Sequence, residues 1–171
     1  VSQWLAQYGE SVAGMPYSEA LKLLSIYTTG SLAGVFCSSL ALRTFLSPQM
    51  MLLGCTTVST LALAVACFFP SPTVMFGFSF IFGFAAAGGV VQLGLAMMAS
   101  QFPRARGRAT GIYYSAGSIS NFTMPLITAW IVREWSIHEI FKFDVIISGC
   151  GILLAVFIAW RSRHAQAIDL N

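Results

Sequence analysis

The sequence predicts an all-α membrane protein, a polytopic bundle of transmembrane helices, and two observations support this prediction. Hydrophobic residues make up 57% of the 171 residues and charged residues 9%, whereas a soluble domain carries about 25% charged residues. Apolar runs long enough to cross a bilayer core of roughly 30 Å, which takes about 20 helical residues, recur along the chain. So few charges cannot coat a water-exposed surface, but a protein surrounded by lipid does not need them.

Five stretches meet this length, and short breaks with stop signals separate them. The first two are separated at Ser47 and Pro48, and the next break holds Pro70 and Pro72, because proline cannot continue a helix there. Short connections place neighbouring helices antiparallel. We therefore expect a five-span bundle within residues 19–163, with spans at about 20–42, 50–69, 73–99, 108–132 and 143–160.

The two ends of the chain are more polar than the spans. Residues 1–18 are too polar and too short to cross the membrane, and they contain Trp4, Tyr8 and Tyr17, aromatics typical of a membrane interface. We interpret this segment as the end of a preceding helix plus an extracytoplasmic loop, and a free amphipathic N-terminus is the alternative. Residues 164–171 are predicted to be a cytoplasmic tail.

Lysine and arginine residues in the short loops predict the orientation. One side of the predicted bundle carries three, Lys22, Arg133 and Lys142. The other side carries six and is expected to be cytoplasmic together with the C-terminus. An N-terminus on the outside followed by five spans is an unusual topology, and we expect a further helix before the first span, which would give six spans in all. The six residues are Arg43, Arg104, Arg106, Arg108, Arg161 and Arg163.

Polar residues follow one face of the fourth predicted span. Steps of four, three, four and three residues put them on one side of a helix. Asn121 lies near the middle of the span, where an unpaired amide is costly. Two interpretations stay open: an interhelical hydrogen bond that holds the bundle together, or a water-filled path that binds solute. The stripe consists of Tyr114, Ser118, Asn121, Pro125 and Thr128.

Two other spans carry small or polar faces. The third span has Gln92 on a face with Ala85 and Gly88, and the first span has Tyr27 and Ser31 on one face. We expect spans one, three and four to surround a cavity and spans two and five to face lipid. No Asp, Glu, Lys or Arg is placed deep in any predicted span, so no proton-coupling residue is identified. The candidate solute contacts are Gln92, Asn121 and Tyr114, followed by Tyr27 and Ser31.

The sequence carries no recognisable catalytic, cofactor or metal motif and no basic surface interleaved with aromatics of the kind that binds nucleic acid. The four cysteines lie inside apolar runs and are expected to pack as small hydrophobic side chains. An enzyme is therefore the least favoured class, and no cofactor is expected. The cysteines are Cys37, Cys55, Cys67 and Cys150.

One stretch resembles a known family. The sequence QFPRARGRATGIYY at residues 101–114 resembles the connection between the tenth and eleventh helices of major facilitator superfamily transporters. Residues 30–34, followed by Arg43 and Pro48, are similar to the eighth helix and its loop, and residues 4–8 to the outer end of the seventh. The acidic residue of the family's cytoplasmic loop motif is absent after Gly34.

The resemblance implies part of a C-terminal six-helix half, namely helices eight to twelve with a remnant of the seventh. It also implies alternating access around a central cavity lined by the eighth, tenth and eleventh helices, and a missing N-terminal half as partner. We expect a secondary active transporter of a small organic solute in the cell's inner membrane. The alternative is a non-transporting membrane scaffold or assembly protein. Arg104, Arg106 and Arg108 are expected to act as a topological anchor or in a gate.

Overall fold

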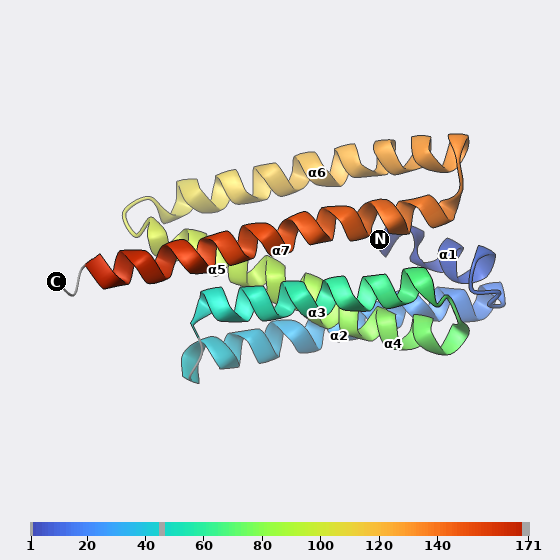
Figure 1. Cartoon of the computed structure of the whole chain (residues 1–171), viewed down its shortest axis with the longest axis horizontal. Coiled ribbons are helices and arrows are strands. Elements are labelled where there is room, and N and C mark those ends of the chain that lie inside the picture. Colours follow the sequence, from blue (N-terminus) through green and yellow to red (C-terminus); the bar gives the residue numbers. More distant parts are fainter. Residues whose placement is uncertain (1, 45–46, 169–171) are drawn as a thin grey trace.

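The computed structural model describes residues 2–44 and 47–168, and every regular element in that part of the chain is a helix (Figure 1). The expected all-α fold is confirmed. The helices lie roughly along one common axis and are joined by short turns. In chain order they are η1 (Ser2–Trp4), α1 (Leu5–Ser11), α2 (Tyr17–Thr44), α3 (Pro48–Phe68), α4 (Pro72–Phe82), η2 (Gly83–Val90), α5 (Val91–Gln101), α6 (Arg106–Glu134) and α7 (Ile137–Ile168).

Within the described residues, four stretches are long and apolar enough to cross a membrane: Tyr17–Leu42, Pro48–Phe68, Pro72–Gln101 and Ile137–Trp160. They correspond to the first, second, third and fifth predicted spans. The fourth predicted span is α6, whose 29 residues reach about 43 Å at 1.5 Å per residue. Its serines, Asn121 and Pro125 make it less apolar than the other four, so its membrane crossing stays a prediction.

Proline marks two of the predicted breaks. Pro48 and Pro72 each occupy the first turn of a helix, preceded by Ser47 and Ser71 in extended conformation. The first turn tolerates proline because the amide it lacks would have no partner inside the helix. Ser71 caps α4 by accepting a hydrogen bond from the Val74 amide at 3.4 Å.

The third predicted span is one rod made of α4, η2 and α5, and its middle section is a π-helix. This section packs directly on α2. The contact is backbone on backbone, because a methyl group at Gly88 would lie 2.5 Å from the Ser31 carbonyl oxygen and 2.7 Å from the Gly34 Cα. Gly83 and Gly30 approach the backbone of the opposite helix even more closely. Small residues thus bring these two spans together, as they do in many membrane proteins.

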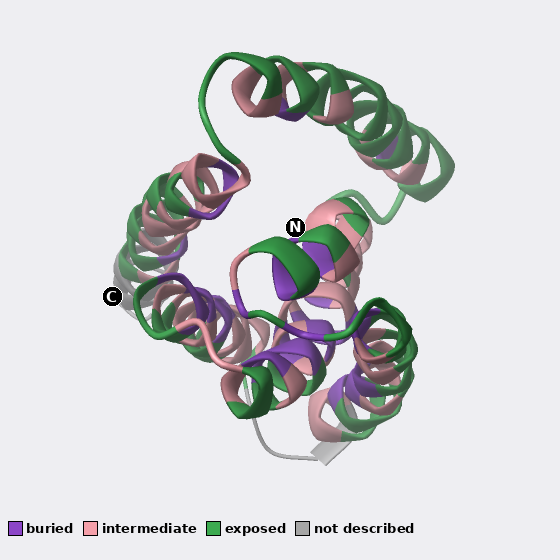
Figure 2. Cartoon of the chain, turned by 90° about the vertical axis from the view of Figure 1, so that its right-hand side faces the viewer, coloured by how far each residue is buried: buried purple, intermediate pink, exposed green. Residues whose placement is uncertain are grey.

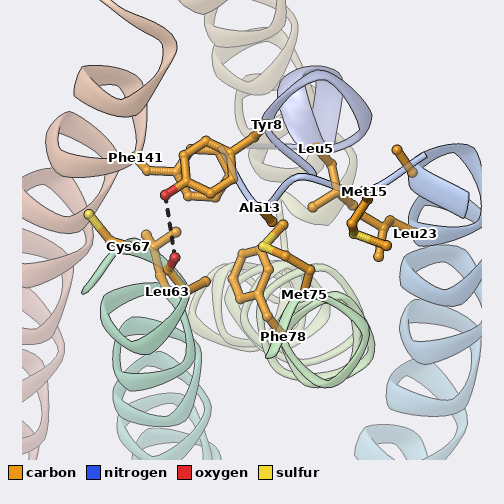
Figure 3. Packing of buried hydrophobic residues seen from close by; sticks show 12 residues of the cluster. Leu5, Tyr8, Ala13, Met15, Leu23, Leu63, Cys67, Met75, Phe78 and Phe141 are labelled. Atoms are coloured by element: carbon orange, nitrogen blue, oxygen red, sulfur yellow. Dashed lines mark hydrogen bonds between the residues drawn. The ribbon is translucent and has the colours of Figure 1, made fainter. Parts of the chain in front are cut away.

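The largest group of buried side chains lies at the end of the bundle that holds α1 (Figure 3). Tyr8 is fully buried, and its ring stacks on Phe141 with centroids 3.6 Å apart. Its hydroxyl donates to the Ala66 carbonyl at 3.3 Å and lies 3.1 Å from the Nδ1 atom of His138. Residues 2–11, predicted to end a preceding helix, therefore form a short helical segment that packs mainly on α2, and its Tyr8 reaches α3 and α7.

The α6 helix stands at the edge of the bundle and is largely exposed (Figure 2). It packs along α5 and α7, and apolar side chains such as Ile119 and Phe122 are exposed. The α3 and α7 helices, by contrast, pack closely and share a hydrogen bond of 2.7 Å between Thr60 and Ser148. Residues 164–168 of the predicted tail continue α7, and residues 169–171 lie outside the described part of the chain.

Candidate functional site

A polar cavity of about 200 Å³ lies between the first residues of the chain, α6 and α7. Ser2–Trp4 form one wall. The α6 wall carries the C-terminal part of the predicted polar stripe, and the α7 wall carries the carboxyl group of Asp144. The lining residues from the two helices are Asn121, Met124, Pro125, Thr128, Asp144 and Ile147.

The α6 wall is built around Pro125. Because proline has no amide hydrogen, the Asn121 carbonyl cannot receive the usual helical bond from residue 125. Thr128, one turn further, donates to the carbonyls of Met124 at 2.8 Å and Pro125 at 3.2 Å. The sequence folds so that a polar side chain and a weakened stretch of helical backbone face the same space.

A hydrogen bond ties the N-terminal wall to α6. The Trp4 indole nitrogen donates to the Thr128 hydroxyl oxygen over 2.9 Å. Thr128 is buried although its helix is mostly exposed. This contact joins residues 124 positions apart and holds Ser2–Trp4 over the cavity.

Asp144 is the cavity residue that sequence reasoning missed. The fifth span was predicted to begin at residue 143, but α7 begins at Ile137 and its apolar stretch runs to Trp160. Asp144 therefore lies about two helical turns inside this stretch, and its Oδ2 atom is buried. The expected start of the fifth span therefore lies too far along the chain, and the assignment of this span to lipid stays a prediction.

The physical reason for this error lies in residues 133–142. Their charges resemble a loop, but Glu139 and Lys142 are accommodated in the first turns of α7, where the Lys142 Nζ atom lies 2.6 Å from the Glu139 Oε1 atom. The signal that could have revealed the site is the spacing of Ile137, Phe141 and Ser148, apolar or small residues on the α3-facing side of one helix.

The similarity of the chain to known proteins indicates its family. The sequence model of the Major Facilitator Superfamily matches residues 1–170. The chain belongs to the Major Facilitator Superfamily. The expected family is thereby confirmed, and the protein is a multi-pass integral membrane protein of a transporter family.

Three relatives of this facilitator chain illustrate the match. It is 53% identical over 163 residues to the inner membrane transport protein YdiM of Escherichia coli, covering 95% of this chain and 40% of the relative. It is 37% identical to the inner membrane transport protein YdiN of the same organism, covering 98% and 40%. It is 33% identical to the uncharacterized MFS-type transporter YfkL of Bacillus subtilis, covering 95% and 41%. The chain thus spans about 40% of the length of each.

The five predicted solute contacts of the facilitator chain do not share one cavity. Asn121 lines the polar cavity. Tyr27 lies close to Ser2 of the N-terminal wall and packs near Phe82, with ring centroids 6.4 Å apart. Ser31 lies in the glycine contact between α2 and η2.

The other two predicted contacts lie closer to the loop between α5 and α6. Gln92 is partly buried in the first turn of α5, beside Val91, whose carbonyl accepts a hydrogen bond from Tyr113 at 2.9 Å. Tyr114 is exposed and lies about 10 Å along α6 from Asn121 at 1.5 Å per residue. The roles of all five in solute binding stay predictions.

Proposed function

We propose that the chain is part of a secondary active transporter that moves a small organic solute by alternating access, and that the polar cavity forms part of the solute path. The observation that carries the proposal is the family match over residues 1–170. Relatives named as inner membrane transport proteins support it. A carboxyl group, an amide and a hydroxyl around one cavity between Ser2–Trp4, α6 and α7 support it as well.

Alternating access needs two bodies that rock against each other. The relatives are about two and a half times as long as this chain, and the remaining length would supply the other body, an N-terminal half. The chain then acts as the C-terminal half, in the inner membrane and with its C-terminus on the cytoplasmic side. The exposed face of α6 supports this proposal, because its apolar side chains fit a surface that faces lipid or further helices.

The chemistry of the cavity suggests how solute is held. The Asn121 side chain offers both a donor and acceptors, and its backbone carbonyl, which Pro125 leaves without a helical hydrogen bond, offers another acceptor. We propose Asn121 as the central contact, with Asp144 added to the predicted set. Gln92, Tyr114, Tyr27 and Ser31 are the further candidates, reached when the helices rearrange.

The scaffold alternative relies on glycine faces that receive partner helices. In α2 and η2 those faces are already used inside the chain, where Gly34 and Gly88 meet. This packing favours transport over a scaffold that binds partners through these glycines.

The test uses the full-length transporter in proteoliposomes, with uptake measured for a panel of radiolabelled sugars, sugar acids and lipophilic cations. For a transported solute, Asn121→Ala should raise KM about three- to ten-fold, the loss expected for one or two neutral hydrogen bonds. The control is Thr123→Ala, an exposed polar residue on the same helix outside the cavity lining. Equal KM values for the two variants would remove Asn121 from the site, and no uptake of any solute would count against transport.

A further inference from the structure

A second groove, of about 310 Å³, lies where α5 passes into α6, at the far end of α6 from the Trp4 contact. Its walls are apolar except for one arginine. This groove lies outside the polar cavity and shares no lining residue with it. The lining residues are Met98, Phe102, Ala105, Arg108, Ala109 and Ile112.

Positive charge is concentrated in the stretch of chain that borders this groove, and Arg108 is the arginine that lines it. Arg104, Arg106 and Arg108 are all exposed. Among the described residues none of the three forms an ion pair, whereas Lys142 pairs with Glu139 at the opposite end of the bundle. Residues 20–133 contain no Asp or Glu, so this stretch supplies no counter-charge.

The groove changes from charged to apolar over one helical turn. Arg108 stands in the first turn of α6, and Ile112 follows on the same face one turn further along the helix. Ile112 is 66% exposed and Phe102 50% exposed, so the apolar wall is open along its length. The groove therefore offers a cation at its rim and an uncovered apolar channel behind it.

We propose that this groove binds one anionic phospholipid. The phosphate lies on Arg108 with Arg104 and Arg106 beside it, and an acyl chain runs along Met98 and Ile112. Basic pockets between membrane helices favour anionic head groups through the same charge attraction, and guanidinium groups suit phosphate oxygens because they can donate two parallel hydrogen bonds. An isolated phosphate ion would leave the apolar wall uncovered, so the ligand is the lipid.

The test measures how much phosphatidylglycerol binds to the purified full-length protein by native mass spectrometry. The protein is held in mixed micelles of detergent and phosphatidylcholine to which phosphatidylglycerol is added at increasing concentration. We expect Arg108→Gln to weaken binding about ten-fold, as for the loss of a charge-assisted hydrogen bond. Ala105→Trp, which fills the groove and keeps every charge, should weaken binding to a similar extent. The matched control is Arg133→Gln, an exposed arginine at the other end of α6, which should bind as the unaltered protein does.

Two results would overturn the assignment. One is an equal loss of binding for Arg133→Gln and Arg108→Gln, which would show that overall charge attracts the lipid. The other is equally tight binding of glycerol 3-phosphate or inorganic phosphate, which would show a head-group site without a chain. Because binding is measured without solute, the outcome is independent of whether the protein transports.

Discussion

The contact between α2 and η2 allows a prediction about a single methyl group. In Gly88→Ala the new carbon would lie 2.5 Å from the Ser31 carbonyl oxygen and 2.7 Å from the Gly34 Cα. An ordinary contact begins at 3.4 Å, so the two helices must separate by about 0.9 Å. Both neighbours are backbone atoms of a continuous helix, so neither can move aside by changing a rotamer.

The cost follows from this geometry. Overpacking of a tight interior costs up to about 3 kcal/mol, and replacing a helical glycine by alanine returns about 1 kcal/mol. The net expected loss is about 2 kcal/mol of unfolding free energy. For a protein of this size each kcal/mol corresponds to roughly 2–4 °C, so the melting temperature should fall by about 4–8 °C.

The matched control is Gly77→Ala, which lies in the same rod with no atom within 4 Å of the added carbon. It should melt at or slightly above the temperature of the unaltered protein. Thermal unfolding of the purified protein in one detergent, followed by intrinsic fluorescence, compares the variants. If Gly88→Ala and Gly77→Ala melt together, backbone contact between α2 and η2 does not limit stability and the argument fails.

Three further predictions concern hydrogen bonds. Burial raises the pKa of Tyr8 from 10.0 to about 12, so the stability that this tyrosine contributes is complete below pH 10 and is lost as pH rises from 10 to 12. Tyr8→Phe should abolish this fall of the melting temperature at high pH, and a variant with the same pH profile as the unaltered protein would contradict the prediction. Thr128→Val should speed amide exchange in α1 more than Thr123→Val does, because it removes the bond from the indole. A double-mutant cycle of Thr60→Val and Ser148→Ala should give a coupling of about 0.6 kcal/mol, and additive effects would argue against the bond.

The sequence predicted the number and order of the helical segments well, for reasons visible in particular residues. Pro48 and Pro72 had to begin helices rather than continue them, and long apolar runs had to be helical in lipid. The stripe on α6 was also predictable, because a regular helix preserves its period, and three of its residues do line one cavity.

The start of α7 could not be placed from its charges. Long side chains such as Lys142 can direct their charged ends away from an apolar region while their stems stay within the helix. The helical period of the third span could not be predicted either, since a π-helix forms hydrogen bonds between residues five apart rather than four. Faces counted at 3.6 residues per turn through Gly83–Val90 therefore lose their phase. The contact of Trp4 with Thr128 depends on the whole bundle and no local pattern encodes it.

The packing of Tyr8 also constrains how the protein is made. Its partner His138 is 130 residues further along the chain. At about 5–20 residues per second during synthesis, roughly 7–26 s pass before the ribosome delivers the residues that bury this tyrosine. During that interval Tyr8 lacks the α7 partners that bury it in the folded bundle. Closure of this end of the bundle thus follows the synthesis of α7, and a nascent chain arrested before α7 should leave Tyr8 accessible to modifying reagents.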